Sequence, residues 1–206
     1  MELIEYIKTL GNVGVALSGG VDSSYLAYVV KQSGIPCKAY TVKSQFVPQF
    51  ELDDAKKIAE FIGIPLEIID IDVLEHKDVT SNPSDRCYYC KHYVFTTISE
   101  QAKRDGFTVL CDGTNASDEV EDRPGMKAIA ELSVKSPLRD CGLTKSMIRQ
   151  LAKQANLFTW DKPSYACLAT RFQAGQHITG HDLEHIEKAE GYLFSLGLSD
   201  FRVRLI

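Results

Sequence analysis

The stretch from Val13 to Ser24 constrains the fold of this chain more than any other. It reads V-G-V-A-L-S-G-G-V-D-S-S, and its apolar, β-branched first half is typical of a short buried strand. Apolar residues then continue from Val21 at the spacing of one helix face. The stretch therefore predicts a strand, a glycine turn and a helix in direct succession.

Such a turn favours the binding of an anion. The first helical N–H groups have no partner inside the helix and carry the positive end of its dipole. Glycine lets the backbone approach a phosphate where a Cβ would obstruct it, and the serines add hydroxyl donors. An ordinary strand–helix turn is the alternative. We expect nucleotide phosphates and magnesium, with Asp22 facing the ion, at Ser18, Gly19, Gly20, Val21, Asp22 and Ser23.

The turn differs from the phosphate loop of kinases, because no G-x-x-x-x-G-K-[ST] occurs in the sequence. S-G-G-x-D-S instead resembles the PP-loop of the ATP pyrophosphatase superfamily. The resemblance implies that ATP is cleaved between its α- and β-phosphates: a substrate oxygen is adenylated, pyrophosphate leaves, and a nucleophile then displaces AMP.

Further strands alternate with helices along the chain. We predict strands over Cys37–Val42, Pro65–Ile71, Phe107–Cys111 and Val134–Leu138. This alternation predicts an α/β fold with right-handed crossovers and a parallel sheet of five strands flanked by helices, Rossmann-like and of the adenine nucleotide alpha hydrolase (HUP) type. Ligands bind such sheets at the carboxyl ends of the strands, so Thr41 and Asp118 join the predicted nucleotide site.

The pattern changes after residue 163. We assign residues 1–163 to a PP-loop domain and residues 164–206 to a cysteine loop with an incomplete substrate-binding region. A helix begins near Thr179, and Phe201–Ile206 alternates as a strand would. A lone terminal strand leaves an unpaired edge. Its partner is therefore either missing or supplied by another subunit, which would make the protein a homo-oligomer.

Two cysteine groups could carry chemistry. Cys87-x-x-Cys90 and a third thiol suit zinc or an iron–sulfur cluster; a redox pair and two buried core thiols are the alternatives. Cys167 lies among small residues with Arg171 four positions on, and could be a nucleophile, a ligand or a packed core residue. We expect a cation such as Arg171 to increase the thiolate fraction of Cys167.

Charged residues supply further candidates. Arg86, Arg171, Arg202 and Arg204 could clamp a phosphate or a carboxylate, and Asp118 and Glu190 could serve magnesium or proton transfer. The alternative for each of them is a solvated surface residue without a functional role.

Composition limits the partners. The 206 residues carry 23 basic and 28 acidic side chains, a net charge of −5, which argues against a large nucleic-acid footprint. No apolar stretch has membrane-spanning length, and the N-terminus lacks the basic and apolar regions of a signal peptide. We expect a cytoplasmic protein with a small-molecule nucleotide substrate and no membrane partner.

Four stretches together resemble the LarE family of ATP-dependent sulfur transferases, which act in nickel-pincer nucleotide biosynthesis. They are the PP-loop and the segments 82–91 (N-P-S-D-R-C-Y-Y-C-K), 112–118 (D-G-T-N-A-S-D) and 160–169 (W-D-K-P-S-Y-A-C-L-A). The resemblance implies that ATP adenylates a carboxylate of pyridinium-3,5-biscarboxylic acid mononucleotide and that sulfur then replaces an oxygen.

The resemblance also implies site roles. Catalysis would involve Asp22, Cys167, Arg171 and Glu190, and Glu190, Arg202 and Arg204 would lie near the substrate phosphate or metal. Cys167 would be a sacrificed sulfur source or, with Cys87 and Cys90, a ligand of a 4Fe-4S cluster; all three cysteines are present, which favours the cluster. Family members continue past residue 206. A tRNA thiolase and a non-catalytic nucleotide- or cluster-binding scaffold are the competing functions.

Overall fold

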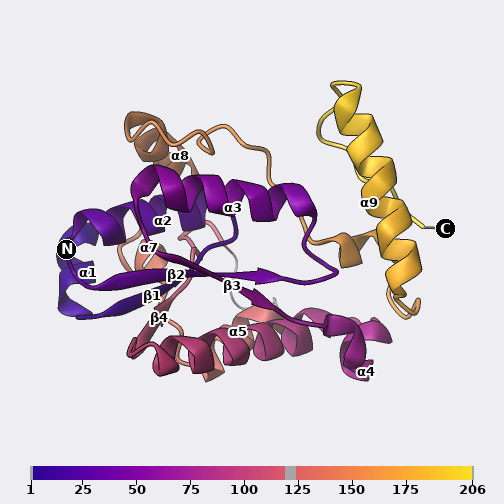
Figure 1. The fold of residues 1–206 in the computed structure, drawn as a ribbon, viewed down its shortest axis with the longest axis horizontal. Helices are drawn as coiled ribbons and strands as arrows, with labels where there is room; N and C mark the ends of the chain where they lie inside the picture. Colours follow the sequence, from indigo (N-terminus) through magenta and orange to yellow (C-terminus); the bar gives the residue numbers. More distant parts are fainter. Residues whose placement is uncertain (1, 119–123, 206) are drawn as a thin grey trace.

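A parallel β-sheet with helices on both faces forms the centre of the protein (Figure 1). The computed structural model describes residues 2–118 and 124–205. The elements of these ranges are α1 (Leu3–Thr9), β1 (Val13–Ala16), α2 (Val21–Gln32), β2 (Cys37–Lys43), α3 (Gln49–Ile62), β3 (Leu66–Asp70), η1 (Val73–Glu75), α4 (Lys77–Thr80), α5 (Arg86–Arg104), β4 (Val109–Cys111), α6 (Pro124–Glu131), α7 (Pro137–Asp140), α8 (Lys145–Gln154), η2 (Leu168–Arg171) and α9 (Gly180–Ser195).

Within the described residues, the sheet has four strands in the order β3-β2-β1-β4, all parallel. Val13 pairs with Cys37 on one side and with Val109 on the other. This arrangement confirms the α/β class and the parallel sheet. It places β1, whose carboxyl end carries the glycine turn, between two neighbours.

The predicted five-strand count is wrong. In place of a strand over Val134–Leu138, Lys135 forms a single parallel bridge with Cys111. Pro137 then begins α7. Because proline has no backbone N–H and its ring favours the first helical turn, the chain leaves the sheet after one bridge.

The two faces of β1 are covered by different helices. Val13 and Val15 are buried in one cluster with residues of α2, α3 and α8, whereas Ala16 packs toward a second cluster that includes Ile98 of α5. Figure 1 shows α3 and α5 on opposite sides of the sheet. Successive side chains of a strand point to opposite faces, so these helices close the sheet on both sides.

The C-terminal part lies beyond the carboxyl ends of the strands, where α9 stands at one end of the molecule (Figure 1). Leu183 and Ile186 of α9 share a buried cluster with Leu168, Phe172 and neighbours that include Phe46 and Val73. The helix predicted near Thr179 is confirmed, since the Thr179 side chain caps α9 by accepting from Asp182 N. The domain boundary at residue 163 remains a prediction.

The strand predicted over Phe201–Ile206 is wrong for the part that the structure describes, residues 201–205, which form no strand. Their backbone amides are used elsewhere. Val203 N donates to Glu190 Oε1 at 2.9 Å, and Leu205 N donates to the Arg171 carbonyl at 3.2 Å. The segment is therefore held by a side chain and a loop, and Ile206 lies outside the described residues.

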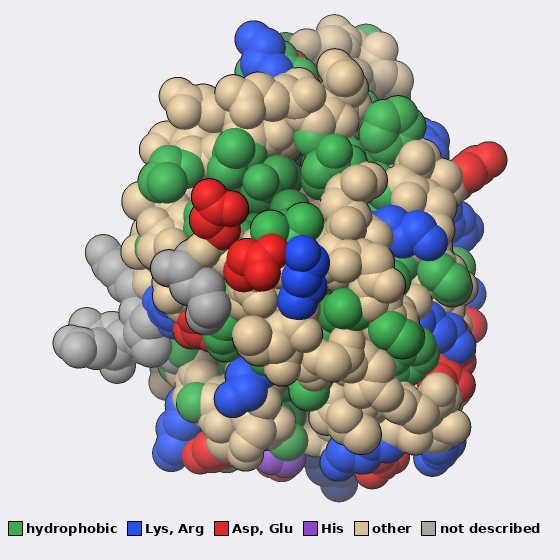
Figure 2. Space-filling view, turned by 90° about the vertical axis from the view of Figure 1, so that its left-hand side faces the viewer, with side chains coloured by type: hydrophobic (Ala, Val, Ile, Leu, Met, Phe, Trp, Pro, Cys, Tyr) green, Lys and Arg blue, Asp and Glu red, His purple; other side chains and the backbone are tan. Residues whose placement is uncertain are grey.

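The charged side chains of the surface are mixed. On the face at the α1 end of the molecule, basic and acidic groups are interspersed around a hydrophobic area (Figure 2). Across the described ranges, no helix is long and apolar enough to cross a membrane.

Candidate active site at the carboxyl ends of the strands

The loop after β1 is closed by serine hydroxyls. Ser23 Oγ accepts from Ser18 N at 3.1 Å, lies 3.0 Å from Ser18 Oγ and donates to the Gly20 carbonyl at 3.2 Å. Gly20 is the N-cap of α2, which begins at Val21. Free N–H groups at a helix N-terminus attract phosphate, so the loop presents the anion site that its sequence predicts.

Position 19 requires glycine for two reasons, the positive φ of the backbone and the lack of space for a Cβ atom. Its φ is +76°, and an added Cβ would lie 2.6 Å from the carbonyl oxygen of Glu51 in the first turn of α3. The Lys162 ammonium donates to the Gly19 carbonyl at 3.1 Å and pairs with Asp54 of α3 at 2.6 Å. Helix α3 and Lys162 therefore hold the loop from behind.

A cavity of about 480 Å³ opens in front of the loop. Sequence-predicted residues from five separate segments line it: Ser18, Gly20, Asp22, Ser23, Thr41, Cys87, Cys90, Asp118 and Cys167. The buried Thr41 hydroxyl donates to the Leu17 carbonyl at 2.6 Å and so fixes the end of β1 against β2. The fold thus brings the nucleotide loop and three thiols to one space.

Only one of the two carboxylate oxygens of Asp22 has a hydrogen-bond partner among the described residues. Its Oδ2 accepts from Lys145 Nζ at the start of α8, while its buried Oδ1 has no hydrogen-bond partner among the described residues. Burial raises the pKa of the Asp22 carboxyl, and the bond from Lys145 opposes that rise. A buried oxygen without a donor fits a cation.

The turn after β4 packs against the start of α2. A Cβ at Gly113 would lie 2.8 Å from Ser23 N. Asp112 accepts from the Ser136 hydroxyl at 2.7 Å, and Asp118 Oδ2 accepts from Asn115 N at 3.0 Å. These bonds shape the turn as a wall of the cavity.

Arg86 brings the cysteines together. Cys87 and Cys90 lie in the first turns of α5, and Cys167 is the N-cap of η2. The Arg86 guanidinium donates to the Asn82 side chain and, at 3.0 Å, to the Ala169 carbonyl. It therefore joins α5 to the Cys167 loop across 83 residues of sequence.

Burial keeps the thiols of Cys90 and Cys167 protonated at neutral pH. Burial raises the pKa of Cys90 to about 12 and also raises that of Cys167; Arg86 and Arg171 are cations that oppose the shift at Cys167. Arg171 interacts with Cys167 in the predicted direction, but burial outweighs it and the net pKa of Cys167 is raised. Over residues 2–118 and 124–205, no group of three or more His, Cys, Asp or Glu side chains is arranged to hold a metal ion.

Arg171 and Glu190 lie behind the Cys167 loop, away from the lining of the cavity. Two Arg171 nitrogens bind the two Glu190 oxygens at 2.8 Å each, with both side chains almost fully buried. Burial raises the pKa of Glu190, but the bonds from Arg171 and Tyr165 outweigh it and lower the pKa. Because Arg171 also donates to the Ala166 carbonyl at 2.8 Å, the pair positions the loop that carries Cys167.

Arg202 and Arg204 are exposed, and the cavity lining does not include them. Arg202 donates to the Ser164 carbonyl at 2.9 Å and lies over the Tyr165 ring, 5.3 Å from its centroid. The structure therefore does not bring these arginines to the thiols and the loop.

Three charged groups of the site were given no role from the sequence: Lys145, Lys162 and Glu51. Lys162 belongs to the W-D-K-P motif, which was the available signal for it. Lys145 follows the helix cap Thr144, and Glu51 lies on an amphipathic helix. No pattern in the sequence links either of them to the loop, because their contacts depend on how the helices pack.

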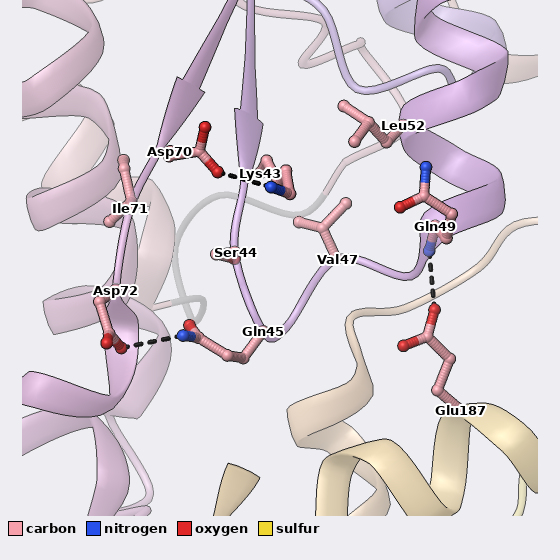
Figure 3. Close-up of a pocket in the computed structure, with 10 residues that line it drawn as sticks. All are labelled: Lys43, Ser44, Gln45, Val47, Gln49, Leu52, Asp70, Ile71, Asp72 and Glu187. Atoms are coloured by element: carbon pink, nitrogen blue, oxygen red, sulfur yellow. Dashed lines mark hydrogen bonds and ion pairs between the residues drawn. The ribbon is translucent and has the colours of Figure 1, made fainter.

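A second cavity, of about 540 Å³, lies between the ends of β2 and β3, the start of α3 and α9 (Figure 3). Its polar groups pair with one another: Lys43 with Asp70 at 2.9 Å, and Gln45 Nε2 with Asp72 Oδ1 at 3.0 Å. Glu187 of α9 accepts from Gln49 N at 2.8 Å. None of the described residues that line this cavity is a sequence-predicted site residue.

Comparisons with known proteins agree with this geometry. The profile of a family described as asparagine synthase matches residues 7–185. The protein slr1717 of Synechocystis sp. is 36% identical over 203 residues, which cover 98% of this chain and 76% of that protein. Pyridinium-3,5-bisthiocarboxylic acid mononucleotide synthase of Lactiplantibacillus plantarum is 30% identical over 206 residues, covering 98% of this chain and 74% of that enzyme.

A tRNA-specific 2-thiouridylase, MnmA of Thermotoga maritima, matches in part. It is 31% identical over 144 residues, which cover 57% of this chain and 39% of that enzyme. The similarity to thiouridylases is thus restricted to a smaller share of both chains.

Proposed function

We propose, from the premise that this chain belongs to the LarE family of PP-loop ATP pyrophosphatases, that it adenylates a carboxylate of pyridinium-3,5-biscarboxylic acid mononucleotide and replaces an oxygen with sulfur. Family membership rests on the profile match and on the relative that the chain covers almost from end to end. The chain is an ATP-dependent sulfur transferase; the acceptor and the sulfur source are the proposed parts.

One observation carries the proposal: the nucleotide loop and Cys167 line the same cavity. An acyl adenylate formed at the loop would need to meet a sulfur nucleophile without crossing bulk water, because water would hydrolyse it. A cavity of about 480 Å³ has the size of a small-molecule site. The site therefore suits a mononucleotide acceptor.

The loop and its neighbours would carry out adenylation. The N-terminus of α2 and the hydroxyl of Ser18 would bind phosphate oxygens. Asp22 would hold magnesium, since its Oδ1 is buried with no partner among the described residues. Magnesium would neutralise charge on the leaving pyrophosphate. Lys145, which donates to Asp22 Oδ2, would lie beside the pyrophosphate as well.

Sulfur would enter from the Cys167 side of the cavity. Cys87, Cys90 and Cys167 are proposed as ligands of a 4Fe-4S cluster on their donor type and shared cavity, since three thiols line one space; in the described residues they are not yet arranged as a ligand group. Such a cluster supplies an open iron that can carry sulfide. The alternative source is the Cys167 sulfur itself. Arg171, Glu190, Arg202 and Arg204 would support the loop and the substrate phosphate.

Pyrophosphate release tests the adenylation. With the pyridinium dicarboxylate mononucleotide and Mg·ATP, wild-type protein should release pyrophosphate and form a thiocarboxylate, and Asp22→Ala should lose both. Release that is independent of the acceptor, or retained turnover by Asp22→Ala, would contradict the assignment.

Iron analysis tests the sulfur source. Anaerobically purified protein should contain close to four irons per chain with visible absorbance that Cys90→Ala loses. Protein without iron whose mass falls by about one H₂S after turnover would instead identify Cys167 as the consumed source.

A second candidate acceptor is tRNA, favoured by the partial match to the 2-thiouridylase. The same pyrophosphate assay with tRNA in place of the mononucleotide separates the two. Cytoplasmic location and homo-oligomerisation remain predictions of the sequence.

A further inference from the structure

Glu51 lines the cavity that the nucleotide loop and Cys167 share. It lies in the first turn of α3, and its backbone carbonyl packs against Gly19 of the nucleotide loop. Its side chain lines the cavity that Ser18 and Cys167 also line. A carboxyl group therefore borders the same cavity as the ATP loop and the thiol.

The Glu51 carboxyl makes no hydrogen bond or ion pair with any described residue. The two nearby cations are engaged with other carboxylates: Lys162 pairs with Asp54, and Arg171 pairs with Glu190. A partly buried acid without a partner is costly to keep charged, and such a group usually has a function.

Burial raises the pKa of Glu51 to about 7; Lys162 and Arg171 oppose the rise, and Asp54 adds to it. Other titratable or charged groups line the same cavity from the neighbouring elements: Asp22 of α2, Arg86, Cys87, Cys90 and Lys91 of α5, Asp112 and Asp118 after β4, and Cys167. Glu51 also raises the pKa of Tyr165. At neutral pH the carboxyl can both accept and give a proton, which is the condition for efficient general acid–base catalysis.

We infer that Glu51 accepts the proton of the sulfur nucleophile when it attacks the acyl adenylate, a step that rests on the proposed function. The S–H bond of the nucleophile, a thiol or a hydrosulfide, breaks as its sulfur bonds to the carbonyl carbon. The C–O bond to AMP breaks, AMP leaves with the electron pair, and the proton passes to the Glu51 carboxylate. Charge and atoms balance without a further reagent.

The need for such a group follows from the thiols. A sulfur nucleophile that still carries its proton attacks weakly until a base removes that proton. Adenylation has no S–H to deprotonate. Loss of Glu51 should therefore impair the second half-reaction and spare the first.

The test measures both half-reactions in single turnovers of the full chain with Mg·ATP, the pyridinium dicarboxylate mononucleotide and added sulfide. Glu51→Gln should keep the pyrophosphate burst but slow C–S bond formation, followed by mass spectrometry, by about 10²–10⁴-fold. In wild type this second rate, divided by the hydrosulfide concentration at each pH, should rise with pH through about 7, and in Glu51→Gln the normalised rate should be low and flat. Glu51→Asp should recover part of the rate, and Glu60→Gln, an exposed position on the same helix, should behave as wild type.

Two results overturn the inference. One is a C–S rate and pH profile in Glu51→Gln equal to wild type. The other is an equal loss of the pyrophosphate burst, which would assign Glu51 to nucleotide or magnesium binding. If wild type and Glu60→Gln release no pyrophosphate at all, the proposed function fails, and the inference falls with it.

Discussion

Replacing Gly19 with alanine should damage the nucleotide loop through two separable effects. The first is conformational, because a non-glycine residue at φ +76° costs about 1–2 kcal/mol. The second is steric. The new Cβ would lie 2.6 Å from the Glu51 carbonyl oxygen and 3.0 Å from Ala55 N, and overpacking of this kind costs about 1–3 kcal/mol.

Gly34 provides a matched control. Its φ is +77°, and a Cβ there would meet nothing within 4 Å, so Gly34→Ala should lose only the conformational part, about 1–2 kcal/mol. Gly19→Ala should lose about 2–5 kcal/mol in total. The difference between the two variants isolates the contact of the loop with α3, because their backbone angles are nearly the same.

Urea unfolding of both variants gives the two free energies, and ATP titration gives the functional effect. Gly34→Ala should bind ATP as wild type does, whereas a displaced loop in Gly19→Ala should weaken binding by about tenfold or more, about 1.4 kcal/mol. If Gly19→Ala unfolds no more easily than Gly34→Ala and binds ATP equally well, the packing of α3 against the loop does not shape the site.

Three further predictions concern charged groups. Lys145→Met should lower the free energy of unfolding at pH 7 by about 1–3 kcal/mol, because Asp22 keeps a buried charge without its donor; the loss should shrink at acidic pH, where Asp22 is protonated, and a pH-independent loss would refute it. Glu190→Ala should cost about 3–5 kcal/mol in urea unfolding by leaving Arg171 buried and unpaired, and a cost below about 1 kcal/mol would show that the pair does not hold the loop. The pKa of Glu51 rises from 4.5 to about 7 on folding, so the folded state binds more protons in that window and wild-type stability should fall as pH rises through it; Glu51→Gln should flatten this fall in stability curves, and an unchanged slope would contradict it.

The main features of the fold could be predicted because they depend on local patterns. Val13–Ser24 holds strand, turn and helix within twelve residues, and the structure shows these three elements in that order, with Gly19 at a positive φ. A fifth strand was predicted over Val134–Leu138 because the segment has the composition of a strand. The prediction was wrong because Pro137 begins α7 and the pairing ends after one bridge. Local apolar content does not reveal where a proline turns the chain.

The sequence predicted many of the residues that line the site, but it did not predict which charged groups act on one another there. The sequence pointed to Arg171 as the cation near Cys167, but a second cation, Arg86, also acts on the thiol from 81 positions away. Likewise the alternation of residues 201–206 suggested a strand, whereas Val203 N binds a Glu190 oxygen. Contacts of this kind depend on tertiary packing, which no spacing in one sequence encodes.

The most direct test of the account is the product formed by Cys167→Ser with Mg·ATP and the pyridinium dicarboxylate mononucleotide under anaerobic conditions. If the nucleotide loop and the thiol serve one reaction in one cavity, the variant should release pyrophosphate as wild type does and form no thiocarboxylate detectable by mass spectrometry. Thiocarboxylate formation at the wild-type rate by Cys167→Ser would contradict the account, since sulfur would then reach the adenylate by another route.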